Sequence, residues 1–112
     1  MTNNIQFSSV CGIDIAKSVM QVYRVTSDGV VSNKAVKRAD FLNEFRNTPP
    51  ALIGMEACGG SQHWARELQS LGHTVRLMPP KLVKPYVTGL KNDKNDARGI
   101  YTCLLYTSPS PR

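Results

Sequence analysis

The sequence predicts a mixed α/β fold in which helices cover the faces of a central sheet. Strand-like runs joined by short turns open the chain, and helical periodicity then alternates with short apolar runs. Hydrophobic residues make up 41% of the 112 residues, which is enough for the core of one small domain. The expected order of elements is β-β-β-α-β-α-β-α.

The first three strands are expected to form an antiparallel meander. Residues 7–15 are largely apolar, residues 20–25 alternate between apolar and polar side chains, and residues 30–36 form a weaker strand. Asp28 and Gly29 give a turn signal between the second strand and the third. Connections as short as these join antiparallel neighbours.

Helices and buried strands alternate after the meander. Asp40 is expected to cap a first helix that ends by Thr48, because two prolines follow. The apolar run at residues 51–55 predicts a buried parallel strand. Ser61 is expected to cap a second helix, which Gly72 would end. The buried face of that helix would carry Trp64, Leu68 and Leu71.

The last predicted elements are a fifth strand and two helices. The strand is expected at residues 73–78 and a short helix at residues 81–86. A final helix is expected to begin at Asn92 or Asp93 and to continue through Tyr101. Strands therefore alternate with helices in the second half of the chain, which predicts a mixed sheet with helices on its faces.

We predict one domain over residues 1–102, the N-terminal part of a longer protein. Residues 103–112 end in Ser-Pro-Ser-Pro, which a helix does not accommodate. This segment resembles translated read-through from a sequencing adapter, so it is expected to be a non-native tail outside the fold. An ordinary flexible C-terminal tail is the alternative.

The chain is basic, with 14 Lys and Arg against 8 Asp and Glu and a net charge of +6. A surplus of this size favours an anionic partner such as nucleic acid, although a merely soluble basic protein can have the same balance. The 3 cysteines form no CxxC pair, which indicates a reducing compartment and no disulfide framework. The sequence shows no leader and no apolar run of membrane-spanning length, so a cytoplasmic location is expected.

Asp14 is the starting point for the functional interpretation. It lies between Ile13 and Ile15 in an apolar strand, where a charged side chain is costly unless something pairs with it. A bound metal ion is one such partner. Lys17, in the turn after this strand, would either contact a phosphate or lie exposed in solvent.

Three further acids are expected to meet Asp14. Glu56 ends the fourth strand, and Asp93 and Asp96 lie on one face of the last helix. Open α/β sheets bind ligands at the carboxyl ends of their strands. Four carboxylates repel one another unless cations compensate, and oxygen donors suit Mg²⁺ or Mn²⁺. Two such ions about 4 Å apart can clamp a phosphodiester during its displacement, so we predict metal-binding and catalytic roles for all four acids.

Basic residues around the acidic pair are predicted to bind a nucleic-acid backbone. Simpler roles remain open: Asp93 and Asp96 as helix-start residues, and Glu56 as a solvated strand end. His63 and His73 lack any ligand spacing and are expected on a helix surface or in a loop. The predicted nucleic-acid-binding residues are Lys17, Lys81, Lys84, Lys91, Lys94 and Arg98.

Three motifs carry a resemblance to a known family. They are Gly-Ile-Asp-Ile-Ala-Lys at residues 12–17, Gly-Met-Glu-Ala-Cys-Gly at residues 54–59, and Lys-Asn-Asp-Lys-Asn-Asp-Ala-Arg at residues 91–98. In this order they resemble the DEDD transposases of insertion sequences, relatives of the Piv DNA invertase. The resemblance implies a ribonuclease H-like domain similar to the RuvC resolvase. Its metal-binding acids would be Asp14, Glu56, Asp93 and Asp96.

The same resemblance implies DNA recombination, assembly into homo-oligomers and, in the better-understood members, a guide RNA encoded by the element. The family also has a C-terminal domain with a serine implicated in strand cleavage, and nothing in this sequence matches it. The chain is therefore expected to be a truncated transposase that does not complete recombination alone. This expectation concerns the isolated chain.

Three competing interpretations differ in what the acids do. A Holliday-junction-type nuclease would use them in the same way as a transposase. A non-catalytic basic nucleic-acid-binding module would use them only as helix caps. An actin-like ATPase is disfavoured, because Ala16 and Lys17 follow Asp14 where that fold prefers Gly and Thr to hold phosphate.

Overall fold

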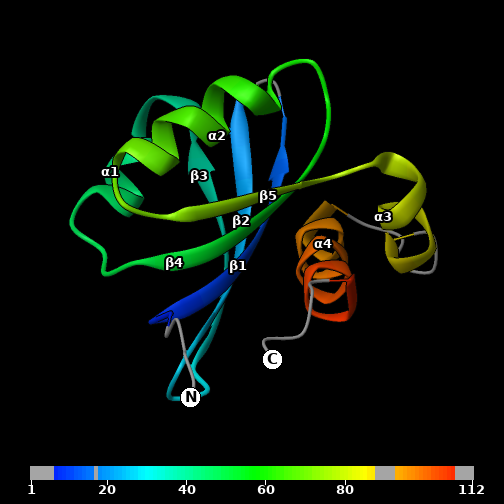
Figure 1. The fold of residues 1–112 in the computed structure, drawn as a ribbon, viewed down its shortest axis with the longest axis horizontal. Helices are drawn as coiled ribbons and strands as arrows, with labels where there is room; N and C mark the ends of the chain where they lie inside the picture. The colour runs from blue at the N-terminus through cyan, green and yellow to red at the C-terminus, as the bar shows by residue number, and fades with distance from the viewer. Residues whose placement is uncertain (1–6, 17, 88–92, 108–112) are drawn as a thin grey trace.

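The structure is a computed structural model that describes residues 7–16, 18–87 and 93–107. Within these residues the chain forms one five-stranded mixed sheet in the order β3-β2-β1-β4-β5 (Figure 1). β1 pairs with β2 and β2 with β3 in antiparallel fashion, whereas β4 is parallel to β1 and to β5. The strands are β1 Ser9–Ile15, β2 Val19–Thr26, β3 Val31–Lys37, β4 Ala51–Glu56 and β5 Thr74–Met78.

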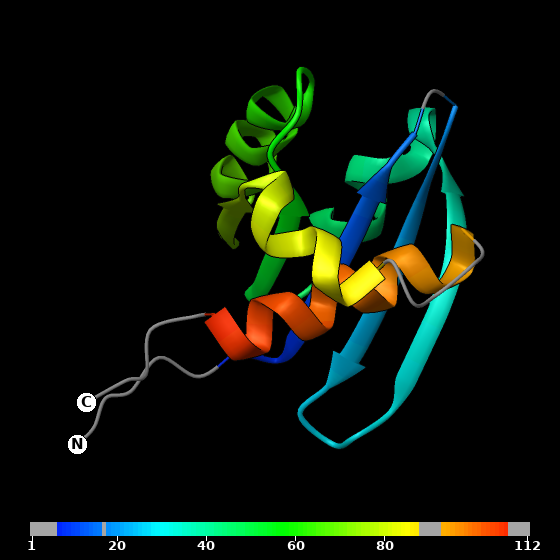
Figure 2. The same ribbon diagram turned by 90° about the vertical axis from the view of Figure 1, so that its right-hand side faces the viewer.

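Helices cover both faces of this sheet. α1 and α2 pack on one face, and α3 and α4 pack on the other (Figures 1 and 2). The helical elements are the 3-10 turn η1 Arg38–Asp40 and the α-helices α1 Phe41–Arg46, α2 Ser61–Ser70, α3 Pro80–Val87 and α4 Asp93–Thr107. The predicted mixed α/β fold and its β-β-β-α-β-α-β-α order are therefore confirmed, with α3 and α4 as the last two helices.

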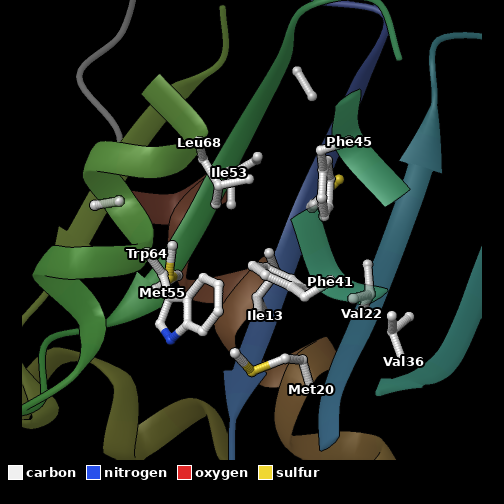
Figure 3. Packing of buried hydrophobic residues seen from close by; sticks show 13 residues of the cluster. Ile13, Met20, Val22, Val36, Phe41, Phe45, Ile53, Met55, Trp64 and Leu68 are labelled. Atoms are coloured by element: carbon white, nitrogen blue, oxygen red, sulfur yellow. The ribbon is translucent and has the colours of Figure 1, made fainter. Parts of the chain in front are cut away.

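Two apolar clusters hold the layers together because strand side chains alternate between the faces. The larger cluster lies under α1 and α2, and Figure 3 shows Ile13, Ile53 and Met55 of the sheet meeting the helical side chains. Phe41 packs edge-on against Trp64, with ring centroids 5.3 Å apart. The smaller cluster lies under α3 and α4 and consists of Met78, Val83, Ile100, Cys103 and Leu104.

The predicted helix caps are only partly correct. Asp40 is the N-cap residue of α1, as predicted, but η1 has already begun the turn and the Asp40 side chain makes no capping hydrogen bond. Gly60, not Ser61, is the N-cap of α2. Ser61 is the first residue of that helix, and its hydroxyl accepts a hydrogen bond from the Cys58 N–H at 3.0 Å and donates one to the Cys58 carbonyl at 2.8 Å. Gly72 follows α2 with φ of +98°, as the prediction of a glycine terminator requires.

The expected end of the last helix was too early. α4 continues beyond Thr102 to Thr107, and the side chains of Cys103 and Leu104 are 0% exposed. These two residues extend the face of Ile100 onto the sheet, where Leu104 lies over Gly54. The first part of the segment predicted to be a tail is thus helical and packed, while residues 108–112 lie outside the described part. The origin of residues 103–112 stays a prediction.

His73 lies in the loop between α2 and β5, in agreement with the expected helix-surface or loop position, but its burial was not expected. Its side chain is only 4% exposed. Nδ1 accepts a hydrogen bond from the Ala51 N–H at 3.0 Å, so Nε2 carries the proton and donates to the Phe45 carbonyl at 2.8 Å. The imidazole therefore joins the end of α1 to the start of β4.

Candidate active site

Strand register places Asp14 and Glu56 side by side. Ile13 on β1 pairs with Met55 on the parallel strand β4, and both side chains are fully buried under α1 and α2. The next residue on each strand faces the opposite side of the sheet. Asp14 and Glu56 therefore share the α4 face at the carboxyl ends of strands that lie about 4.8 Å apart. Both carboxylates are partly buried.

Helix α4 crosses the same face at very close range. A Cβ atom at Gly12 would overlap the Ala97 carbonyl oxygen and the Tyr101 backbone nitrogen, and it would lie 2.8 Å from the Tyr101 Cα. Only glycine lets the helix backbone approach β1 this closely. In Figure 2 α4 runs across the strands, and it contacts β1, β2, β3 and β4. The Gly-Ile-Asp motif thus supplies both the Asp14 carboxylate and, at Gly12, the position where the backbone of α4 packs closely against β1.

The close packing at Gly12 places Asp96 of α4 near the strands that carry Asp14 and Glu56. Asp96 directly precedes Ala97, whose carbonyl lies on Gly12, and Gly12 is two residues before Asp14 on the same face of β1. Asp96 is partly buried. Asp93 begins α4 as predicted, but the placement of its side chain lies outside the described residues. The four acids therefore belong to three neighbouring elements.

The predicted four-acid cluster itself stays a prediction. Among the side chains that the structure describes, no group of three or more His, Cys, Asp or Glu residues could hold a metal ion. Asp14 and Glu56 are brought together by register, and Asp96 lies on the helix that crosses them. The structure does not gather three of these acids into one ligand set in its described part.

The basic residues fall on the helices beside this face. Lys81 and Lys84 are exposed on α3, and Arg98 is exposed on α4. The two helices pack closely at Gly99, where a Cβ would lie 2.8 Å from the Tyr86 carbonyl oxygen. Of the other predicted nucleic-acid-binding residues, Lys17 and Lys91 lie outside the described residues, and so does the side chain of Lys94.

Two groups in and behind the site have altered titration. Burial raises the pKa of Tyr101, and the nearby Tyr23, whose ring centroid is 5.0 Å away, raises it further. The Tyr101 phenol therefore stays neutral at physiological pH. Burial also raises the pKa of the Cys11 thiol, which faces the core under α1, although Arg24 and Ser9 lower it in part. Cys11 and Cys103 are buried, whereas Cys58 is exposed.

Arg38 was not singled out from the sequence. Its guanidinium Nη1 donates to the Ala16 carbonyl at 3.0 Å, and its backbone N–H donates to the Ser18 carbonyl at 2.9 Å. The same guanidinium lies 5.2 Å from the centre of the Trp64 ring. No periodicity or motif in the sequence could have shown this contact, because it joins three separate elements.

A sheet of this order and these strand directions, with acids at the carboxyl ends of its first and fourth strands, has the ribonuclease H-like architecture that the resemblance implied. The chain is 50% identical over 102 residues to a probable family 20 transposase from Pseudomonas aeruginosa, covering 90% of this chain and 30% of that protein. It is 40% identical over 92 residues to the transposase for insertion sequence element IS1111A from Coxiella burnetii, covering 81% of this chain and 25% of that protein. These relatives confirm the resemblance to insertion-sequence transposases.

The similarity concerns only part of each relative, since the chain spans less than a third of their length. No protein-family model matches the sequence. The solved structure of RuvC from Thermus thermophilus aligns with 93% of this chain and 83% of its own, with a TM-score of 0.43 and 19% identity. None of the described helices is long and apolar enough to cross a membrane.

Proposed function

We propose that this chain is the N-terminal catalytic domain of a DEDD-type transposase that acts on phosphodiester bonds of insertion-sequence DNA with divalent metal ions. The observation that carries the proposal is the pairing of Ile13 with Met55, which sets Asp14 beside Glu56 on the face that α4 crosses. The transposase relatives support the reaction class. A basic surface beside the acids is what a polyanionic substrate requires.

The residues available fit a hard divalent cation. Two carboxylates on adjacent strands, and a third on the helix across them, offer oxygen donors, which suit Mg²⁺ or Mn²⁺. Asp14, Glu56, Asp93 and Asp96 are the proposed ligands. When bound, such ions polarise a phosphoryl oxygen and activate the attacking hydroxyl or water. The chain's own contribution is to hold the carboxylates on the rigid ends of β1 and β4.

The basic residues are proposed to hold the DNA backbone. Lys81, Lys84 and Arg98 are exposed on helices packed against the acid-bearing face. Each phosphate that they neutralise releases counterions, so binding would weaken steeply as salt rises. Lys17, Lys91 and Lys94 complete the proposed set.

Further properties follow from the family resemblance and are proposed for the longer protein. They are assembly into homo-oligomers and use of a guide RNA encoded by the element. We propose residues 1–102 as the transposase domain and a non-native origin for residues 103–112, of which Cys103 and Leu104 pack on the sheet. Because the chain spans less than a third of the length of its relatives, we propose that the isolated chain binds metal and DNA without completing recombination.

Metal binding by the isolated chain tests the proposal. We expect calorimetric titration with Mn²⁺ to show binding that Asp14→Asn and Glu56→Gln each weaken about tenfold or more. The matched control is Asp28→Asn, which removes an exposed carboxylate from the β2–β3 turn. Equal Mn²⁺ affinity in all four proteins, with unchanged circular dichroism, would exclude the proposed site.

A non-catalytic nucleic-acid-binding module is the second candidate. It is favoured by the lack of a three-residue ligand cluster among the described side chains and by the net charge of +6. Such a module would bind DNA with a steep salt dependence that is the same in EDTA and in Mn²⁺. The transposase proposal, and equally a Holliday-junction-type nuclease, predicts DNA binding that responds to the metal through Asp14.

A further inference from the structure

We propose that Arg38 and Trp64 are positioning residues that hold the loops after Asp14 and Glu56 at a fixed separation, and thereby set the geometry of the two carboxylates. This inference rests on the proposed metal-dependent function. Neither residue touches the reacting atoms in the proposal. Trp64 packs in the core on the opposite face of the sheet from α4, and the Arg38 guanidinium lies over its ring.

The first contact fixes the connection that follows Asp14. β1 ends at Ile15 and β2 begins at Val19, so Ala16 and Ser18 belong to the tight turn between them. Arg38 is bound to both carbonyls, through Nη1 at 3.0 Å and through its backbone N–H at 2.9 Å. Hydrogen bonds from a charged donor are stronger than neutral ones. The position of this turn is therefore set by Arg38 as well as by the pairing of Ile15 with Met20.

The second anchor is helix α2, which follows the loop after Glu56. β4 ends at Glu56 and α2 begins at Ser61, and Trp64 lies in the first turns of that helix. Its side chain is 8% exposed, and its indole packs edge-on to Phe41. Figure 3 shows Trp64 beside Met20 of β2, at the end of the core nearest the β1–β2 turn. The position of the indole is thus tied to the sheet.

The guanidinium of Arg38 connects the turn after β1 to Trp64 of α2. It lies over the Trp64 ring at 5.2 Å from the ring centre, while its Nη1 holds the turn. A planar guanidinium can stack on an aromatic face and donate in its own plane at the same time, whereas a lysine ammonium cannot do both. The turn after Asp14 and the helix after Glu56 are therefore connected through a single side chain.

The direction of the change in Mn²⁺ affinity on removal of Arg38 separates a positioning role from a purely electrostatic one. Removing a positive charge near a cation site strengthens cation binding by electrostatics alone. A positioning role predicts the opposite, because the carboxylates lose their fixed separation. Groups that support metal ligands typically contribute 10- to 100-fold in metal affinity. Arg38→Ala is therefore expected to weaken Mn²⁺ binding about tenfold, and Arg66→Ala, which removes an exposed arginine from α2, is expected not to weaken it.

The test combines Mn²⁺ titration with hydrogen exchange on the 112-residue chain. We expect Arg38→Ala to raise amide exchange in residues 15–20 about tenfold, while exchange in β4 stays as in wild type. Trp64→Leu, which keeps Arg38 and the net charge, is expected to weaken Mn²⁺ binding as well. Circular dichroism unchanged from wild type would report that the Arg38→Ala chain is folded, because the fluorescence of Trp64 responds to the loss of the guanidinium itself.

Each result has a defined meaning. Faster exchange together with weaker Mn²⁺ binding in Arg38→Ala supports the inference. Unchanged exchange, or faster exchange with equal or tighter Mn²⁺ binding, overturns it and leaves the metal site standing. If the wild-type chain binds no Mn²⁺, the metal-dependent function fails first, and the positioning role falls with it.

Discussion

The contact between Gly12 and α4 gives the sharpest prediction about this fold. In Gly12→Ala the new methyl group would overlap the backbone of Ala97 and Tyr101, and it would lie 2.8 Å from the Tyr101 Cα. These are backbone atoms of a helix, so the strain cannot be relieved by a rotamer change. Either α4 or β1 must shift. Overpacking of this kind costs about 1–3 kcal/mol, which lowers the melting temperature by roughly 10 °C in a domain of this size.

Two other glycines make matched controls for this substitution. A Cβ at Gly54 would meet Leu104 Cδ2 and Met78 Cε at 3.0 Å, which are the ends of flexible side chains, so Gly54→Ala is expected to cost less. A Cβ at Gly59 would have nothing within 4 Å, so Gly59→Ala should leave stability within about 0.5 kcal/mol of wild type. Urea denaturation measures all three free energies of unfolding. Equal stability of Gly12→Ala and Gly59→Ala would refute the close packing of α4 on β1.

Three further predictions follow from buried polar groups. His73→Ala should lower the free energy of unfolding by about 3 kcal/mol, because the Ala51 N–H and the Phe45 carbonyl lose their hydrogen-bond partner. Urea denaturation measures this loss, and His63→Ala, at an exposed histidine, is the control. A loss no larger than that of His63→Ala would contradict the prediction. Arg24→Met should raise the free energy of unfolding by about 1 kcal/mol, because Nε and Nη2 of Arg24 are buried without a hydrogen-bond partner among the described residues. A lower free energy of unfolding would show that the contact between the guanidinium and the Phe45 ring stabilises the fold by more than the burial destabilises it. A thiol-reactive probe should label Cys58 and leave Cys11 unmodified until the chain unfolds. Because burial raises the pKa of Cys11, the thiol of the folded chain keeps its proton to a higher pH than the thiol of the unfolded chain. The free energy of unfolding is therefore expected to be constant below the ordinary thiol pKa of about 8.5 and to fall at higher pH. A free energy of unfolding that rises above that pH would contradict the burial of Cys11.

Local pattern was sufficient for the elements of this fold and for part of the site. The alternation in residues 20–25 and the apolar run at residues 51–55 predicted strands that the structure contains. Glu56 was correctly placed at the end of its strand. Given a parallel pairing of the first and fourth strands, Asp14 and Glu56 had to be near neighbours, because both follow residues that face the core.

Contacts between elements that are distant in the sequence could not be predicted from local sequence patterns. His73 is buried because a carbonyl from α1 and an amide from β4 happen to flank it, and neither is visible near it in the sequence. Leu104 packs over Gly54, and the Cys103 thiol donates to the Leu82 carbonyl of α3 at 3.4 Å, whereas the Ser-Pro repeat that follows suggested a tail. Arg38 looked like an ordinary basic residue in a polar stretch, although it contacts Ala16 and Trp64.

The central claim is that β1 and β4 present Asp14 and Glu56 as one cation site beneath α4. Anomalous scattering from crystals of the chain soaked in Mn²⁺ tests it most directly, since the ion itself becomes visible. The account predicts a peak bounded by the Asp14 and Glu56 carboxylates and next to the first turns of α4, with carboxylate oxygens among the ligands. Manganese bound only at other carboxylates, with these two carrying no ion at saturating concentration, would contradict it.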